Sequence, residues 1–433
     1  MIDIKLIRED TEKVKECLGK KGIPAGAIDK LLELDARRRE IIKDAEQLKS
    51  VRNKASQDVA KMKKDGNDAS DTIAEMKKVS DDIKLKDDAL AVIEKDIENA
   101  LRDIPNLPED SVPLGKSADD NVQFRIWGEK PTSPHPLSKG EGHEPIYDFK
   151  YLDHVELGKK HDILDFGTGA KISGSGFPFY KGKGAILERA LINFMLDSHK
   201  TNGYTEVYVP FLVNRESMEA AEKVPKFEED MYRTDDDLFA IPTAEVPILN
   251  IHRDETLNLE QLPVKYCGFT ACFRREAGSY GKDTKGFLRV HQFNKVELVN
   301  FCTAETSYDE MENMLNHACG ILEALNIHYR VVYVCTGDMG FATSKQYDIE
   351  VWSPAENKWL EASSVSNCTD FQSRRANIRT KRDKKMEFVH ILNGSGLATS
   401  RLFVALVESN QTPEGKIIIP SVLHKYTGFE VIG

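Results

Sequence analysis

Several features are missing from this sequence of 433 residues. It contains no run of about 18 consecutive apolar residues, which a membrane-spanning helix would need. Its first residues, MIDIKLIRED, are charged and lack the apolar stretch of a secretory signal. The seven cysteines include no CxxC pair, which argues against a disulfide framework or a cysteine zinc site. These absences predict a cytoplasmic protein with reduced cysteines, no membrane association and no zinc.

Positive charge is also scarce, because 60 Lys and Arg residues face 71 Asp and Glu residues and the net charge is -11. Binding to a nucleic acid would therefore depend on a local basic surface rather than on the overall field. Neither a GxxxxGK[ST] phosphate loop nor a strand-linked GxGxxG motif is present. Phosphate binding by either of these two common loops is therefore excluded for this chain.

Residues 28 to 104 show apolar positions at alternating spacings of three and four. This pattern indicates helices that pack along a coiled-coil seam. The polar turn KKDGNDAS (63–70) divides the pattern into two parts of nearly equal length. We therefore predict an antiparallel helical hairpin over about 28–104, whose seam is interrupted at Arg38, Arg52, Thr72 and Lys86.

Charge is shared unequally between the two predicted helices. Residues 28–64 hold 11 Lys/Arg against 7 Asp/Glu, whereas residues 65–104 hold 6 against 12. Either the hairpin is only a solvated coiled coil, or its first helix offers a basic face to a polyanion. The composition leaves both readings open.

The remainder of the chain is built differently, beginning with the proline-rich linker IPNLPEDSVPLG. Helices are expected at 185–200, stopped by Asn202 and Gly203, and at about 304–325. TEVYVPFLV (205–213) reads as a strand. Strands that arrive as hairpins predict an α+β fold, in which an antiparallel sheet is flanked by helices.

The stretch FRREAGSYGKDTKGFLRVHQFNKVE (273–297) reads as a β-hairpin with a polar face. Side chains of a strand alternate between two faces. One face of 288–298 would carry Arg289, His291, Phe293, Lys295 and Glu297, and Arg274 and Glu276 would share a face before the glycine-rich turn. Such a face is either solvated or the floor of a polar site.

This stretch resembles motif 2 of class II aminoacyl-tRNA synthetases, in the form found in seryl-tRNA synthetases. FPFYKGKGAILERALINF followed by GYTEVYVPFLV resembles motif 1, IPTAEVP (241–247) resembles the loop that closes on the amino acid, and NGSGLATSRLFVALVE (393–408) resembles motif 3. Together with the helical hairpin, the resemblance covers nearly the whole chain in the expected order. It implies an N-terminal tRNA-binding domain over 1–110 and a class II catalytic domain over 111–433.

The resemblance also implies an activity and its site. A family member joins L-serine to ATP as seryl-adenylate and transfers serine to tRNA(Ser), and the family also allows tRNA(Sec) as an acceptor. Arg274 and Arg401 are the implied catalytic residues. The implied ATP-binding residues are Arg274, Arg275, Glu276, Val290, Phe293, Glu361, Ala362, Ser363, Ser364 and Arg401. The implied serine-binding residues are Thr243, Ala244, Glu245, Arg274, Glu297 and Ser395. Glu361 and Ser364 would bind Mg²⁺, and residues 185–213 would form a homodimer interface.

Two other functions remain open at this point. The chain would be a class II paralogue if it activated an amino acid for an acceptor other than tRNA, but such a protein is expected to lack the helical hairpin. A non-catalytic RNA-binding relative is expected to have lost Arg274, Glu276, Glu361 or Arg401, and all four are present.

Overall fold

The computed structural model describes residues 1–129, 150–277 and 286–433. Gly278 and Gly281 of the predicted turn lie outside the described residues. The chain forms two compact units, Met1–Leu107 and Pro108–Gly433. Its assignment to a tRNA-binding part and a catalytic part remains a prediction. Among the described residues, no helix is long and apolar enough to cross a membrane.

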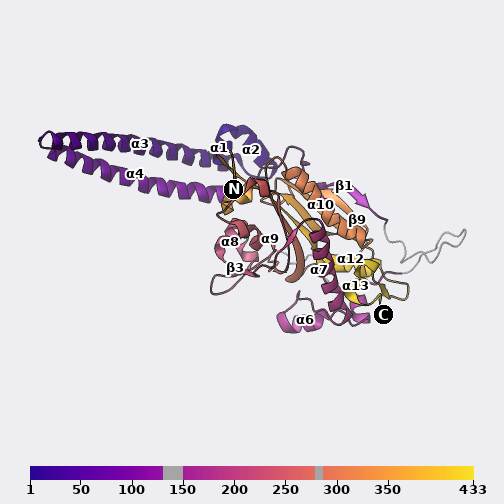
Figure 1. Cartoon of the computed structure of the whole chain (residues 1–433). Coiled ribbons are helices and arrows are strands. Elements are labelled where there is room, and N and C mark those ends of the chain that lie inside the picture. The colour runs from indigo at the N-terminus through magenta and orange to yellow at the C-terminus, as the bar shows by residue number, and fades with distance from the viewer. Residues whose placement is uncertain (130–149, 278–285) are drawn as a thin grey trace. The chain divides into compact units, whose positions relative to one another are not determined.

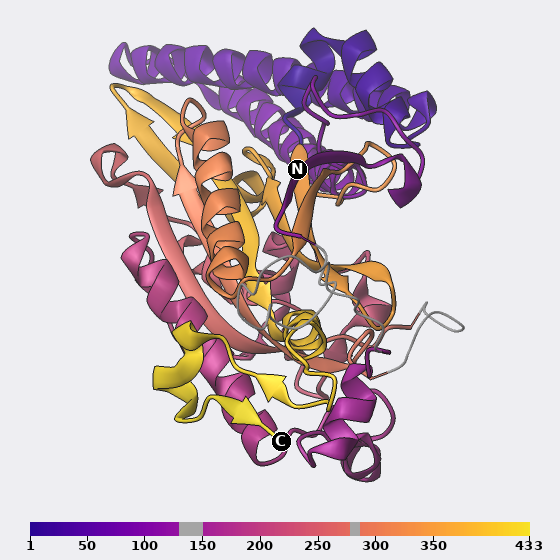
Figure 2. The ribbon, with the colours of Figure 1, turned by 90° about the vertical axis from the view of Figure 1, so that its right-hand side faces the viewer.

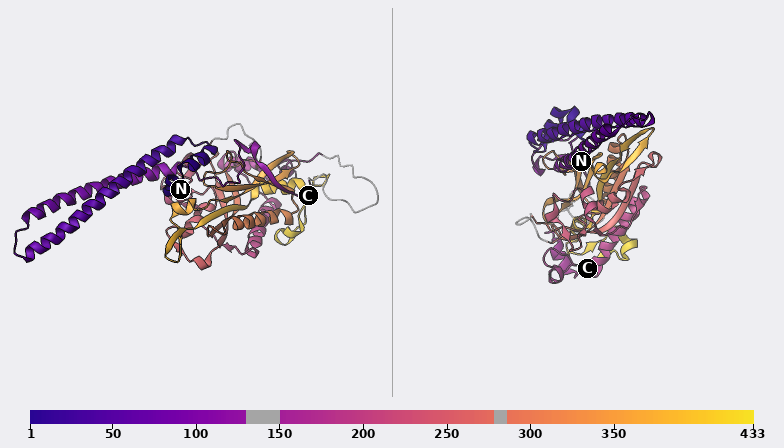
Figure 3. Two further views of the ribbon diagram at one scale, coloured as in Figure 1. Left: turned by 90° about the horizontal axis from the view of Figure 1, so that it is seen from above. Right: turned by 90° about the vertical axis from the view of Figure 1, so that its left-hand side faces the viewer.

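The first unit is helical. Two short helices, α1 (Ile4–Glu9) and α2 (Thr11–Lys20), precede the long helices α3 (Ala25–Lys64) and α4 (Ser70–Arg102). Figures 1 and 3 show α3 and α4 side by side in opposite directions, as the seam predicts. At 1.5 Å per residue, α3 is about 60 Å long.

Salt bridges account for one interruption of the seam. Lys86 on α4 pairs with Asp44 on α3 at 2.6 Å, and Lys49 on α3 pairs with Asp87 on α4 at 3.0 Å. The Lys86–Asp44 pair joins the two helices at a seam position that lacks an apolar side chain, and the Lys49–Asp87 pair is a second link between the same helices. Ile83, Ile93 and Ile97 of α4 are buried, as predicted for seam positions.

The second unit is built on a sheet of eight strands in the order β1-β9-β10-β11-β14-β8-β7-β2. Every neighbouring pair is antiparallel except β2 and β7, which are parallel. The strands are β1 (Val122–Trp127), β9 (Tyr329–Tyr333), β10 (Lys345–Ser353), β11 (Lys358–Asn367), β14 (His390–Ala398), β8 (Gln292–Cys302), β7 (Val264–Phe273) and β2 (Thr205–Glu206). The α+β prediction with an antiparallel sheet is confirmed.

Three helices cover this sheet: α7 (Lys183–Thr201), α10 (Ser307–Ala324) and α12 (Thr399–Ser409). Figure 2 shows orange α10 lying along the strands. Buried apolar side chains of all three helices join Val296 and Leu298 of β8 in one core. Helix α7 stops at Asn202, and Gly203 follows with a φ of +85°, which confirms the predicted stop.

Smaller elements complete the second unit. The helices α5 (His154–Lys160), α6 (Phe166–Ser173), α8 (Arg215–Ala220), α9 (Glu245–Leu249), α11 (Phe371–Ala376) and α13 (His424–Thr427) surround the sheet. The short strands are β3 (Leu212–Val213), β4 (Tyr232–Arg233), β5 (Phe239–Ala240), β6 (Thr256–Leu257), β12 (Arg379–Arg382), β13 (Lys385–Phe388), β15 (Ile417–Ile418) and β16 (Val431–Ile432).

Three local predictions were wrong. Residues 205–213 do not form one strand, because only β2 and β3 at its two ends pair with neighbours. Strand β8 begins at Gln292, so residues 288–291 lie outside the strand. Glu276 comes after the end of β7 and has a left-handed φ of +52°. Arg274 and Glu276 therefore do not share a strand face.

Candidate active site

Two cavities open on one side of the sheet. Their volumes are about 500 Å³ and about 370 Å³. Six residues line both cavities: Arg274, Glu276, Arg289, Lys295, Ser364 and Ser395. The two cavities are therefore neighbouring parts of one polar site.

The structure brings most of the predicted site residues together here. The first cavity is lined by Thr243, Glu245 and Glu297 in addition to the shared residues. The second cavity is lined by Val290, Phe293, Glu361, Ala362, Ser363 and Arg401 in addition to the shared residues. Arg275 and Ala244 line neither cavity. The Arg275 backbone N–H donates to the Asp230 carbonyl, and Ala244 is fully buried among apolar side chains, so binding roles for these two residues stay predictions.

Strand β8 supplies the floor of the site. Phe293 lines the second cavity, Glu297 lines the first, and Lys295 between them lines both. The opposite face of the strand buries Val296 and Leu298 in the core under the helices. The predicted alternation is therefore confirmed for 292–298, and the polar face is a site rather than a solvated surface.

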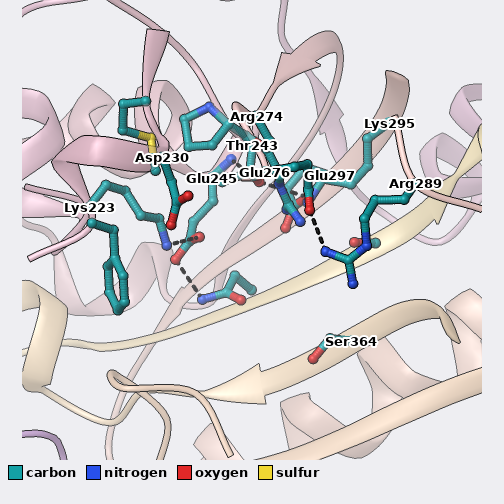
Figure 4. Close-up of a pocket in the computed structure, with 15 residues that line it drawn as sticks. Lys223, Asp230, Thr243, Glu245, Arg274, Glu276, Arg289, Lys295, Glu297 and Ser364 are labelled. Carbon is teal, nitrogen blue, oxygen red and sulfur yellow. Dashed lines mark hydrogen bonds and ion pairs between the residues drawn. The ribbon is translucent and has the colours of Figure 1, made fainter. Parts of the chain in front are cut away.

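The first cavity ends at a carboxylate surrounded by donors. Glu245 Oε2 lies 3.1 Å from Lys223 Nζ (Figure 4), and its Oε1 accepts hydrogen bonds from Gln372 at 2.6 Å and from Asn393 at 3.0 Å. Burial disfavours a charged Glu245, but the positive charge of Lys223 and the hydrogen bond from Gln372, with a smaller contribution from Lys295, outweigh burial and lower its pKa. Glu245 is therefore ionised and held in place by its partners in this cavity.

A second carboxylate lies beside it. Thr243 Oγ1 donates to Glu297 Oε2 at 3.2 Å, and Lys295 forms an ion pair with the same oxygen. Burial raises the pKa of Glu297, Lys295 partly offsets this, and the charge of Glu245 adds to it. Two acidic groups and a threonine hydroxyl are suited to bind a small ligand that carries an amine and a hydroxyl.

The second cavity combines an aromatic ring with cationic groups. The Arg274 guanidinium lies 5.1 Å from the centre of the Phe293 ring, and its Nε donates to the Pro242 carbonyl at 3.4 Å. Arg401 donates to the Glu361 carbonyl, and its Nη1 lies 3.5 Å from the Glu361 carboxylate. Arg289 forms an ion pair with Glu276. An aromatic surface beside guanidinium groups is suited to a base and its phosphates.

Oxygen ligands gather on the paired strands β10 and β11. Asp348 lies opposite Ser364 in the strand register, and Glu361 is close enough to influence its charge. Burial, followed by the negative charge of Glu361, raises the pKa of Asp348 to about 7. Two repelling carboxyls beside a hydroxyl fit Mg²⁺, which takes one or two carboxylates and completes its shell with water and phosphate. The described residues contain no group of three or more His, Cys, Asp or Glu arranged for a metal ion.

Comparisons with known proteins agree with this architecture. Residues 1–108 match the family model described as the seryl-tRNA synthetase N-terminal domain. Residues 226–410 match the class II tRNA synthetase core domain (G, H, P, S and T). A serine–tRNA ligase of Chlorobaculum parvum is 52% identical, with 100% of both chains covered. The chain belongs to the seryl-tRNA synthetase family.

Further relatives support this membership. The serine–tRNA ligase of Chloroherpeton thalassium is 53% identical, again with 100% of both chains covered. The crystal structure of seryl-tRNA synthetase from Pyrococcus horikoshii complexed with ATP is 39% identical, with a TM-score of 0.92 over 100% of this chain and 99% of that one. The predicted resemblance is therefore confirmed for both units of this seryl-tRNA synthetase family member.

The sequence did not identify every residue of the site. Arg289 and Lys295 stand in the quoted motif 2 stretch, and their alternation with Phe293 and Glu297 was the available signal. Asn393 opens the quoted motif 3 stretch but was not assigned a role, and Lys223 and Gln372 lie in none of the quoted motifs. These three residues come from a loop, a helix and a distant strand that meet only at Glu245.

Proposed function

We propose that this chain is a serine–tRNA ligase, which activates L-serine with ATP and transfers it to the 3′ end of tRNA(Ser). One observation carries the proposal: Phe293 and Glu297 lie on one face of β8, four residues apart, and line the two joined cavities. At 3.3 Å per residue they are about 13 Å apart. An extended adenylate would place its base near Phe293 and its amino acid near Glu297.

The residues that line the two cavities have different roles in this proposal. Glu245, Glu297, Thr243 and Ser395 bind the amine and the hydroxyl of serine, and Arg274 binds its carboxylate together with the α-phosphate of ATP. Positive charge from Arg274 and Arg401 stabilises charge that develops on the phosphates during adenylyl transfer. Glu276, Val290, Phe293 and residues 361–364 complete the ATP site. Mg²⁺, held by Glu361 and Ser364, would neutralise phosphate charge.

The tRNA partner is assigned to the helical hairpin. Arg37, Lys54 and Lys61 are exposed on α3, whereas Arg39 and Lys49 are engaged with Asp35 and Asp87. The exposed basic side chains support contact with tRNA phosphates. The family also supports tRNA(Sec) as an acceptor, homodimer formation and a place in the cytoplasm.

The experiment measures two steps separately. Pyrophosphate exchange that depends on serine reports activation, and charging of purified tRNA(Ser) reports transfer. We expect both activities, with serine preferred over other amino acids. Exchange without charging of tRNA would favour an acceptor other than tRNA, and absence of exchange in folded protein would contradict the proposal.

A further inference from the structure

Lys223 is an unexpected group in the first cavity. It follows α8 on a loop, and its ammonium lies 3.1 Å from the Glu245 carboxylate with only 21% of its side chain exposed. Burial disfavours its charge, but the carboxylates of Glu245 and Glu222 outweigh burial and raise its pKa. A lysine in this place therefore stays charged beside the proposed serine-binding carboxylate.

Its neighbour Glu222 has an uncommon conformation. It ends α8 with a left-handed φ of +48°, a position that favours glycine, and the next N–H, of Lys223, donates back to the Met218 carbonyl. Its side chain is nevertheless buried, with a relative exposure of 4% for the residue. A strained backbone conformation of this kind persists only where the surrounding structure enforces it, and such residues cluster at functional sites.

Glu222 reaches Glu245 through one amide. Gln372 on α11 donates from its Nε2 to Glu222 Oε1 at 2.8 Å and to Glu245 Oε1 at 2.6 Å. Burial raises the pKa of Glu222, Lys223 partly offsets this, and Glu245 adds to it. Lys223, Glu245, Gln372 and Glu222 are therefore linked in this order, and Glu245 is the acceptor among them that lines the cavity.

We propose that Lys223 is a positioning residue for serine binding, which holds Glu245 charged and in one orientation, and that Glu222 fixes the Gln372 amide in the same arrangement. This inference rests on the proposed function, since it concerns the serine end of that site. An acceptor held by several donors loses little freedom when a ligand binds, which favours affinity. The nucleotide end is lined by other residues, so its affinity should not depend on these four linked side chains.

The main test is Lys223→Met, which removes the charge and keeps a side chain of similar length. In serine-dependent pyrophosphate exchange, the KM for serine should be higher by roughly tenfold or more, because loss of a hydrogen bond to a charged group weakens binding by about this factor. The KM for ATP should stay within about twofold. A serine KM unchanged from wild type, or equal rises in both KM values, would overturn the inference.

Two further variants guard against simple misfolding. Lys265→Met is the matched control, because Lys265 forms a similar pair with Glu310 at 2.6 Å, with side chains 18% and 13% exposed, and neither residue lines the cavities. It should leave both KM values unchanged.

Glu222→Gly removes the carboxylate but suits the left-handed backbone. Circular dichroism checks that this variant is folded, and its KM for serine should rise about threefold. A normal KM in the folded variant would contradict the role assigned to Glu222.

The proposed function and this inference fail in distinguishable ways. If the wild-type protein shows no serine-dependent exchange, the proposed function is wrong. If the wild-type protein exchanges and Lys223→Met has normal kinetics for serine, only the inference is wrong.

Discussion

Asn294 on β8 donates a 2.8 Å hydrogen bond to Oε1 of Glu188 on α7, and Thr399 at the start of α12 donates to the same oxygen. One buried carboxyl thus links the strand that carries Phe293 to the helix that carries Arg401. Burial raises the pKa of Glu188 to about 7, although hydrogen bonds from Thr399 and Asn294 partly offset it.

Glu188 should make stability depend on pH. Because its pKa rises from 4.5 to about 7 on folding, its contribution is fully present below pH 4.5 and is lost as pH rises to about 7. The loss is on the order of 3 kcal/mol. Glu188→Gln, which stays neutral and still accepts both hydrogen bonds, should remove this dependence in urea unfolding between pH 5 and pH 8. Exposed Glu75→Gln is the control, and a variant with the wild-type slope would contradict the assignment.

Glu297 should matter for serine more than for ATP. Glu297→Ala removes the partner of buried Lys295 and the acceptor for Thr243, so serine activation should fall while ATP binding is largely kept. The unaltered site should reject alanine by about 10⁴–10⁵-fold, because a site built for a hydroxyl leaves its polar groups unpaired with alanine. Pyrophosphate exchange with both amino acids checks this. Equal rates with serine and alanine would refute the prediction.

Glu361 should set the Mg²⁺ requirement. Glu361→Gln removes one anionic oxygen from the proposed metal site, so half-maximal exchange should need roughly tenfold more Mg²⁺. The same change should lower the pKa of Asp348, because the charge of Glu361 contributes to raising it. A Mg²⁺ titration of exchange, with Glu356→Gln as control, measures the effect. An unchanged titration curve would place the metal elsewhere.

The helical hairpin should be separable from activation. Its seam residues pack on one another, and α3 and α4 lie in a compact unit of their own. Replacement of 31–101 by a glycine-serine linker should leave serine-dependent exchange nearly intact and abolish charging. Charging that survives the deletion would make the hairpin only structural. Lost exchange in a folded protein would show that the two parts are coupled.

Individual basic residues of α3 provide a finer test. Each phosphate contact removed, for example by Lys54→Ala or Lys61→Ala, should make log K against log salt less steep by about 0.7–0.9. Exposed Asp58→Asn on the same helix is a control, and an unchanged slope for the lysine variants would exclude these contacts.

The motif 1 region should form a two-fold interface. Tyr208, between β2 and β3, is 84% exposed, and Leu212 on β3 is 48% exposed. Tyr208→Glu should weaken a dimer and lower activity at dilution, as light scattering and exchange assays would show. Leu85→Glu changes a similarly exposed apolar residue on α4 and should have no such effect. A wild-type monomer with full activity would overturn the dimer prediction.

Local patterns were sufficient for part of this protein. The spacing of apolar residues determines the two long helices, because a helical seam repeats along the chain itself. The alternation of Phe293, Lys295 and Glu297 with Val296 and Leu298 determines which face of β8 is polar, because strand side chains alternate with period two. Patterns of this kind also carried the family resemblance.

Tertiary structure decided the rest. Lys223, Gln372 and Asn393 stand far apart in the chain and meet only because a loop, a helix and a strand converge on Glu245. The left-handed backbone of Glu222 and Glu276 contradicts what their side chains favour, since tertiary contacts outweigh local preference there. Burial of Glu188 raises its pKa only because α7, β8 and α12 close around it, and no spacing along the sequence encodes that enclosure.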